Sequence, residues 1–201
     1  MLNDGTLIIG MTGASGAIYG IRALEVLKKL GVETCLVITK TGEKIIEYET
    51  KYSVTDVKRL STYWYDVNNL SAPIASGSFP TRGMVIIPCS MKTLAGVANG
   101  YSDNLLLRAA DVTLKEGRPL ILVLRETPLN VIHLRNMLKL AEMNVRILPA
   151  SPSFYYKPRK VDDLVNYVVG KALELLGIKH GLYKAWNDFS GVQVDDMENR
   201  Q

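Results

Sequence analysis

Residues 7–18 read LIIGMTGASGAI. The run from Leu7 to Met11 predicts a buried β-strand, and Gly13 and Gly16 predict a tight turn directly after it. Apolar residues then recur with the helical period from 18 to 30, and Gly31 ends that helix. A strand, a glycine turn and a helix form the first half of a βαβ unit, the building block of a parallel sheet.

The same alternation continues along the rest of the chain. Further strands are expected at 34–38, 83–87, 120–124 and 145–148. Helices are expected at 41–50, briefly after Ser53, at 90–99, from an N-cap at Asp103 to Lys115, at 129–144 and at 161–176. In the helix at 129–144, Leu134, Met137, Leu138 and Ala141 fall on one face. Residues 63–81, rich in turn-forming residues, predict a long loop. We therefore predict one doubly wound α/β domain over 1–187 and a polar tail at 188–201.

Composition narrows the class of protein. The chain has 201 residues, of which 47% are hydrophobic and 22% charged, as expected of one compact globular domain. No apolar run approaches the roughly 18 residues of a membrane span, and the start of the sequence does not read as a secretory signal. The net charge of +4 has no basic arm, which argues against a nucleic-acid partner. Two cysteines and two histidines are too few for a disulfide framework or a structural zinc site. A cytoplasmic protein is expected.

Candidate ligand-binding residues follow the expected strands. In open parallel sheets, ligands bind beyond the carboxyl ends of the strands. Every such end in this sequence has hydroxyl, glycine, cationic or aromatic residues, namely 12–16, 39–41, 88–93, 125–127 and 149–156. This recurrence predicts one site along that edge of the sheet.

The first turn resembles a phosphate cradle at a helix N-terminus. It lacks the G-x-G-x-x-G spacing because residue 12 is threonine, and the second strand ends in Thr39 instead of the acid that holds a dinucleotide ribose. A mononucleotide phosphate therefore fits better than NAD, although tight strand–helix packing also explains such glycines. A serine-hydrolase elbow around Ser15 fails, since Ala17 stands where glycine is required.

Three cations have both a structural and a functional interpretation. Lys115 closes a helix, where a cation stabilises the helix dipole. Lys171 falls on the apolar stripe of the last helix, which fits either a snorkelling lysine or a phosphate ligand. Arg125 directly follows a strand, where ligands bind. His133, His180 and Cys35 are expected to be structural, and Cys89 has no neighbouring base to activate it.

Several blocks of this sequence together resemble the UbiX-like flavin prenyltransferases. They are TGASGA at 12–17, SGSF at 76–79, GMVIIPCSMKTL at 83–94, RAADV at 108–112, LKE at 114–116, RETPL at 125–129 and PSFY at 152–155. The likeness covers about 7–187. It implies a Rossmann/flavodoxin-like three-layer sandwich and a homo-oligomer, typically a dodecamer built of trimers, with active sites at subunit interfaces.

The resemblance also implies a reaction and its participants. Such enzymes join a dimethylallyl group, from dimethylallyl monophosphate or diphosphate, to N5 and C6 of reduced FMN without a metal. The product, prenylated FMN, serves a UbiD-like decarboxylase.

Carried over to this sequence, the resemblance assigns site residues. The FMN site comprises Gly13, Ala14, Ser15, Thr39, Ser90, Met91, Lys92, Thr93 and Arg125. The prenyl phosphate site comprises Lys115, Arg125, Glu126, Tyr155, Lys171 and Trp186. Ser15 and Glu49, the latter expected from a neighbouring subunit, are assigned to the N5 proton, and Glu126 to a later proton relay. No metal ligand is assigned. Position 171 is lysine where relatives often have arginine, which keeps the charge and loses the planar fork.

Two other functions remain possible at this stage. An FMN-dependent cysteine decarboxylase shares the expected fold, but it uses a histidine after the second strand that this sequence lacks. A non-catalytic FMN-binding subunit of a hydroxyarylic acid decarboxylase, or a flavin carrier, needs only one phosphate cradle. The additional cations Lys115 and Lys171 favour the transferase.

Overall fold

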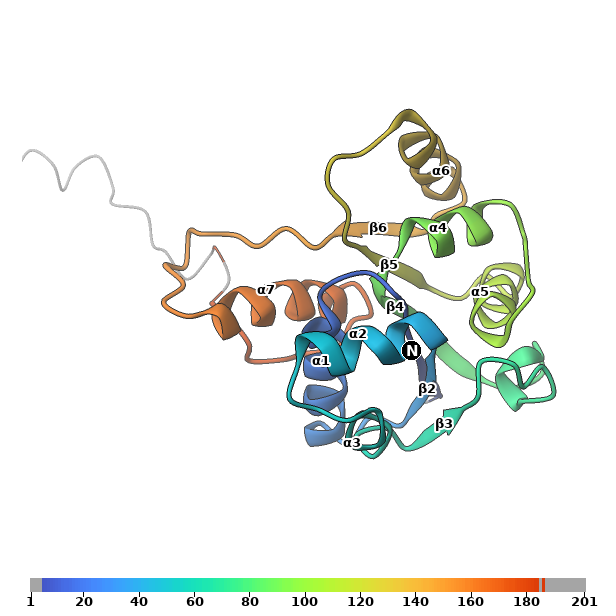
Figure 1. Cartoon of the computed structure of the whole chain (residues 1–201), viewed down its shortest axis with the longest axis horizontal. Coiled ribbons are helices and arrows are strands. Elements are labelled where there is room, and N and C mark those ends of the chain that lie inside the picture. Colours follow the sequence, from blue (N-terminus) through green and yellow to red (C-terminus); the bar gives the residue numbers. More distant parts are fainter. Residues whose placement is uncertain (1–4, 185, 187–201) are drawn as a thin grey trace, which may run out of the picture.

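The computed structural model describes residues 5–184 and 186 (Figure 1). The sheet contains six parallel strands in the order β3-β2-β1-β4-β5-β6. They are β1 (Thr6–Met11), β2 (Thr34–Ile38), β3 (Tyr63–Tyr65), β4 (Thr81–Cys89), β5 (Leu120–Leu124) and β6 (Arg146–Pro149). The predicted doubly wound parallel sheet is confirmed. The predicted tail at 188–201 lies outside the described residues.

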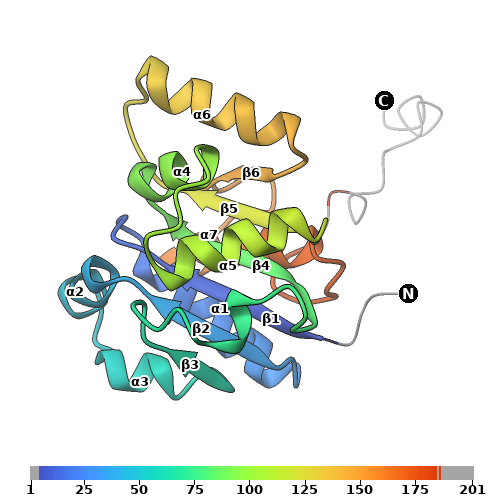
Figure 2. The same ribbon diagram turned by 90° about the vertical axis from the view of Figure 1, so that its right-hand side faces the viewer.

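Helices cover both faces of this sheet. They are α1 (Ala17–Lys29), α2 (Lys40–Glu49), α3 (Val54–Lys58), α4 (Met91–Ala98), α5 (Leu105–Lys115), α6 (Val131–Glu142) and α7 (Val161–Glu174). Figure 2 shows α4, α5 and α6 on one side of the strands and α1 on the other. Within the described part of the chain, none of the helices is both long and apolar enough to cross a membrane.

The core consists of two layers separated by the sheet. Along β1, Leu7, Ile9 and Met11 join a cluster with residues of α1 and α7, whereas Ile8 joins a cluster with residues of α4 and α5. This alternation follows from the two-residue period of a strand, and it explains why the strand is apolar on both faces. The strand order reverses direction between β1 and β4, which is the position where open parallel sheets of this kind bind ligands.

The prediction of a single long loop over 63–81 is wrong. Tyr63–Tyr65 forms the edge strand β3, whose Tyr63 lies opposite Cys35 of β2, and Pro73–Ala75 forms a short 3₁₀-helix. Only three residues pair, and their exposed aromatic side chains give no clean alternation of apolar and polar residues. The strand is therefore specified by pairing with β2 more than by its own pattern.

The N-cap of α5 also differs from the prediction. Asn104, not Asp103, caps the helix, and its side chain accepts a hydrogen bond from the Leu107 N–H at 3.0 Å. The Asp103 carboxylate instead accepts a hydrogen bond from the Asn104 amide at 2.8 Å. Both residue types cap helices well, so sequence alone did not separate two adjacent candidates.

The apolar face of α6 is largely exposed to solvent in the single chain. Leu134 and Leu138 are 51% and 61% exposed, and Leu140 is the helix's buried residue. Val131 and Ile132 at the start of the helix are exposed as well. A contiguous apolar face of this kind on one chain is typical of a contact with another subunit.

The first prediction concerns the packing of α1 on the sheet. A Cβ at Gly20 would overlap the carbonyl oxygen of Ile87 in β4, and a backbone atom cannot move away cheaply. We expect Gly20→Ala to lower the thermal midpoint by about 5 °C through overpacking. Gly181→Ala is the matched control, because a Cβ there meets nothing within 4 Å. An equal midpoint for both variants in a thermal melt would contradict the close approach of α1 and β4.

Candidate active site

The loops after β1 and β4 are joined by one buried hydroxyl. Thr12 Oγ1 donates a hydrogen bond to the Pro88 carbonyl at 2.8 Å and accepts one from the Ser90 N–H at 2.9 Å. Thr12 is almost completely buried. It therefore fixes the first residue of the glycine turn against the N-cap of α4, which brings two predicted ligand-binding loops together.

A cavity of about 240 Å³ opens between these loops. Its lining includes predicted FMN-site residues, namely Gly13, Thr39, Ser90, Lys92 and Thr93. Ser90 caps α4, so the positive end of that helix dipole and the Lys92 ammonium both lie at the cavity. Ala14 and Met91 were also predicted for the FMN site. Both are buried, and they directly follow the lining residues Gly13 and Ser90 in the sequence. This combination favours an anionic group such as a phosphate.

Glu49 lies at the N-terminus of α1. One oxygen of its carboxylate accepts hydrogen bonds from the N–H groups of Gly16 at 2.7 Å and Ala17 at 3.1 Å. Gly16, the N-cap, has a φ of 100° that favours glycine. The chain's own Glu49 occupies this position, which corrects our expectation that a neighbouring subunit supplies it.

The surroundings of Glu49 keep its carboxylate ionised. Burial raises its pKa, but the hydrogen bonds from Ser15, Gly16 and Ala17 outweigh that effect, and the charge of Arg125 adds to them. The pKa of Glu49 consequently lies below its ordinary value. Ser15 and Glu49, predicted as a pair, thus lie in contact.

Arg125 follows β5 and faces the same region. Its charge lowers the pKa of Glu49 and opposes the rise that burial causes in the pKa of Tyr19. Its Nε atom is buried and has no hydrogen-bond partner among the described residues. A buried guanidinium nitrogen in this state is suited to an incoming acceptor. Glu126, the next residue, is exposed, and its carboxylate accepts a hydrogen bond from the Thr127 N–H at 3.0 Å.

Lys115 lies at the end of the sheet opposite the cavity, near the amino ends of the strands. The cavity is lined by the start of α5, whereas Lys115 ends this helix of 11 residues. At 1.5 Å per residue, the two ends are roughly 16 Å apart, farther than a lysine side chain extends. Lys115 instead pairs with Glu116, and a Cβ at Gly77 would lie 2.8 Å from its Nζ atom. Within one chain, the structure does not bring Lys115 to Arg125.

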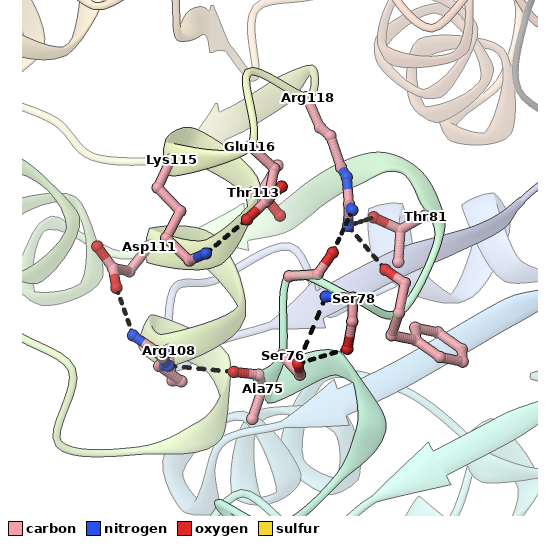
Figure 3. Close-up of polar contacts among 12 residues, drawn as sticks. Ala75, Ser76, Ser78, Thr81, Arg108, Asp111, Thr113, Lys115, Glu116 and Arg118 are labelled. Carbon is pink, nitrogen blue, oxygen red and sulfur yellow. Dashed lines mark hydrogen bonds and ion pairs between the residues drawn. The ribbon is translucent and has the colours of Figure 1, made fainter.

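The loop beside Lys115 is fixed by arginine (Figure 3). Arg118 donates hydrogen bonds to the carbonyl groups of Gly77 at 2.7 Å and Phe79 at 2.8 Å, and to the Thr81 hydroxyl at 3.0 Å. Arg108 donates one to the Ala75 carbonyl at 3.2 Å. Arg118 thus holds the SGSF block at 76–79 in place next to the Lys115 ammonium.

Three other predicted residues gather at α7 and the segments before and after it. The rings of Tyr155 and Trp186 meet edge-to-face at 5.2 Å, and Lys171 lies close enough to Tyr155 and Tyr167 to interact electrostatically. Figure 1 shows the segment after β6 running out past the sheet before α7 returns. The predicted site residues therefore fall into separate groups at the cavity, at Lys115 and at α7.

Sequence reasoning missed the cavity residues from the start of α5, namely Asn104, Leu106 and Leu107, and it missed Tyr19 near Arg125. Thr12 and Thr41 also line the cavity and lie within the predicted ligand-binding ends 12–16 and 39–41, although neither was assigned to the FMN site. Thr12 opens the TGASGA block, so that motif held a usable signal. The start of α5 comes from far along the sequence, and only the fold reveals its proximity.

The described cysteine, histidine and acidic side chains indicate neither a thiolate nucleophile nor a metal site. Burial raises the pKa of the Cys89 thiol, which disfavours a thiolate nucleophile. Within the described residues, no group of three or more histidine, cysteine or acidic side chains is placed to hold a metal ion.

Comparison with known proteins identifies the family. The family model described as Flavoprotein matches residues 1–173. A flavin prenyltransferase UbiX from Thauera aromatica is 51% identical over 90% of this chain and 93% of its own length. The chain belongs to the UbiX family of flavin prenyltransferases. The resemblance drawn from the TGASGA, PCSMKT and RETPL blocks is thereby confirmed.

Two solved UbiX structures are similar to this chain. AnUbiX (PadA1), crystallised in complex with FMN and dimethylallyl pyrophosphate, superposes with a TM-score of 0.91 at 45% identity, covering 92% of this chain and 99% of that one. A dodecameric FMN-dependent UbiX-like decarboxylase from Escherichia coli O157:H7 has a TM-score of 0.89 at 50% identity, covering 90% and 98%.

The second prediction concerns the Glu49 carboxylate. Because its pKa is lowered in the folded protein, its stabilising effect is complete above the unfolded value of about 4.3 and is lost as pH falls through the folded value. We expect Glu49→Gln to lower the thermal midpoint by about 2–4 °C at pH 7. The difference from wild type should shrink once the pH falls below the unfolded pKa.

The control for this prediction is Glu47→Gln, an exposed residue of the same helix. The measurement is the thermal midpoint of the wild type and of both variants across that pH range. An equal loss at neutral and acidic pH would show that the charge of Glu49 does not stabilise the start of α1.

Proposed function

We propose that this protein is a flavin prenyltransferase, which joins the dimethylallyl group of a dimethylallyl phosphate to N5 and C6 of reduced FMN. The observation that carries the proposal is the ionised Glu49 beside Ser15 and a buried, unpartnered Arg125 Nε, next to a phosphate-binding helix N-terminus. Membership in the UbiX family and the ligands named for AnUbiX support it. The whole of residues 1–187 is proposed as the catalytic domain.

The described residues fit FMN. The N-terminus of α4 and Lys92 suit its phosphate, and Gly13 lines the cavity with a backbone that packs closely on the Thr41 side chain. Arg125 Nε offers a buried donor that has no acceptor among the residues the structure describes. The predicted FMN-site residues between Gly13 and Arg125 are proposed in that role. The family model also describes flavoproteins.

Reduced FMN supplies the two acceptor atoms of the reaction, and the phosphate of the donor leaves with the electron pair of the broken C–O bond. Glu49 is an ionised carboxylate, so it can accept the proton lost at N5 directly or through Ser15. Arg125, Lys115 and Lys171 stabilise the charge that develops on the leaving phosphate. Glu126, beside Arg125, is assigned to the proton transfer that accompanies bond formation at C6.

The aromatic rings near Lys171 fit the prenyl group. Tyr155 and Trp186 form an edge-to-face pair beside the ammonium of Lys171. Such rings exclude water and interact favourably with positive charge that develops on the prenyl carbons. Tyr155, Lys171 and Trp186 are therefore proposed as one part of the donor site.

We propose that the complete site is shared between subunits. Lys115 lies about one helix length from the cavity of its own chain, so a neighbouring copy has to supply it. The exposed apolar face of α6 and the dodecameric state named for the E. coli relative support an oligomer. The product is proposed to serve a UbiD-like decarboxylase, and the free thiols of Cys35 and Cys89 suit the reducing cytosol.

The third prediction tests the activity. Mixing the protein anaerobically with reduced FMN and dimethylallyl monophosphate should increase the mass of the extracted flavin by one five-carbon prenyl unit. Repeating the reaction with the diphosphate identifies the donor. Glu49→Gln should slow the reaction by about a hundredfold while FMN still binds, as expected for loss of a proton acceptor. Unmodified FMN with both donors, from protein that binds flavin, would leave a flavin carrier as the function.

The fourth prediction tests the shared site. Arg125→Ala and Lys115→Ala should each be inactive as pure oligomers. If one site takes these residues from different copies, oligomers reassembled from equal amounts of both variants should regain about a quarter of wild-type activity by random mixing. Mixed oligomers as inactive as the pure variants would place both residues in the site of one chain.

A further inference from the structure

Lys171 is held by a carboxylate that the proposed reaction does not use. Its ammonium donates a hydrogen bond to Glu174 Oε2 at 2.6 Å, one helical turn further along α7. Both side chains are partly exposed at the end of that helix. A lysine has four rotatable side-chain bonds, so a fixed partner strongly restricts where its charge lies.

The other oxygen of Glu174 is fixed by the segment that folds back after α7. Tyr183 donates a hydrogen bond from its hydroxyl to Glu174 Oε1. His180 Nε2 lies 3.4 Å from the same oxygen, and the side chain of His180 is only 5% exposed. His180 Nδ1 accepts a hydrogen bond from the Leu182 N–H at 3.2 Å, which orients the ring with Nε2 toward Glu174.

The backbone is shaped to allow this arrangement. A Cβ at Gly170 would lie 2.5 Å from Tyr183 Cε1 and 2.6 Å from His180 Cε1. The rings of Tyr183 and Tyr167 are 4.8 Å apart, so the returning segment packs directly on α7. The group of Glu174, His180 and Tyr183 is thus built against the helix, next to the residue that holds Lys171.

The charges within this group agree with the geometry. Burial raises the pKa of Glu174, but the hydrogen bonds from Lys171 and Tyr183 and the charges of Lys171 and His180 lower it below its ordinary value. The hydrogen bond to Glu174 in turn raises the pKa of Lys171, against the effect of burial. An ammonium has three N–H donors, and the bond to Glu174 uses one of them, so an oxygen of a phosphate can accept another.

We propose that Glu174, fixed by the Tyr183 hydroxyl, is a positioning residue that orients Lys171 toward the phosphate of the prenyl donor. The proposal rests on the proposed function for the identity of that donor. It also explains how lysine serves at a position where a planar arginine fork is absent, because the carboxylate supplies the orientation that a guanidinium has by itself.

A double-mutant cycle tests whether Glu174 acts through Lys171. The probe is dimethylallyl monophosphate, titrated into the protein loaded with oxidised FMN, so that binding is measured without turnover. We expect Glu174→Ala to weaken donor binding about tenfold, as expected for losing the order of one long side chain. In the Lys171→Ala background, the same substitution should change donor binding less than about twofold, because its target is gone.

Matched variants separate positioning from general damage to the fold. Asp162→Asn removes one negative charge from the first turn of α7, where Asp162 pairs with Lys160, and should leave donor binding unchanged. FMN affinity and oligomer size should be the same in all variants. If Glu174→Ala does not assemble, Tyr183→Phe removes one donor to the carboxylate and should weaken donor binding about threefold only when Lys171 is present.

Three results would overturn the proposal. They are an equal effect of Glu174→Ala in both backgrounds, no effect in either, and tighter donor binding, which would make Glu174 a competitor of the phosphate. Failure of the prenyl transfer itself is distinguishable, because it appears as unmodified flavin from wild-type protein in anaerobic turnover. The binding cycle with oxidised FMN does not depend on that outcome.

Discussion

The candidate site depends on the hydrogen bonds of the Thr12 hydroxyl. It joins the end of β1 to the loop after β4 through the Pro88 carbonyl and the Ser90 N–H. These strands are neighbours at the point where the strand order reverses, which is the position where open parallel sheets of this kind bind ligands. By closing that point, Thr12 fixes both the glycine turn that begins α1 and the serine that caps α4. Lys92 then lines the cavity between these loops, and Glu49 accepts hydrogen bonds at the start of α1.

The division of the site follows from the antiparallel course of helices and strands. A helix that connects two parallel strands starts near the carboxyl ends of the strands. It runs back antiparallel to them and therefore ends near their amino ends. The start of α5 therefore lines the cavity, while Lys115 at its end lies beside the loop fixed by Arg118. A single chain of this fold cannot place both ends of α5 at one ligand. Assembly of several copies resolves this conflict, and the apolar face of α6 provides a surface for it.

The sequence predicted the sheet well because strands buried on both faces are continuous apolar runs, and it predicted the cavity residues because they directly follow those runs. It failed where a partner far along the chain, or a single hydrogen bond, decides the local structure. Tyr63–Tyr65 is a strand because β2 is there to pair with it, and Asn104 caps α5 although Asp103 has equal propensity. The exposure of Leu134 and Leu138 was unpredictable from periodicity, which shows that a face is apolar but not whether the same chain covers it. Tyr19 near Arg125 required the fold itself.

Two carboxylates in this structure show how the same charge can be used in different ways. Glu49 is held by backbone N–H groups at the start of α1, which have no alternative partner in a helix, so its position is as rigid as the helix. Glu174 is held by the side chains of Tyr183 and Lys171, so its position depends on a segment that folds back on α7. A proton acceptor has to be fixed before the substrate arrives, and a lysine with four rotatable side-chain bonds needs a partner that orients its charge. The backbone support of Glu49 and the side-chain support of Glu174 match these two requirements.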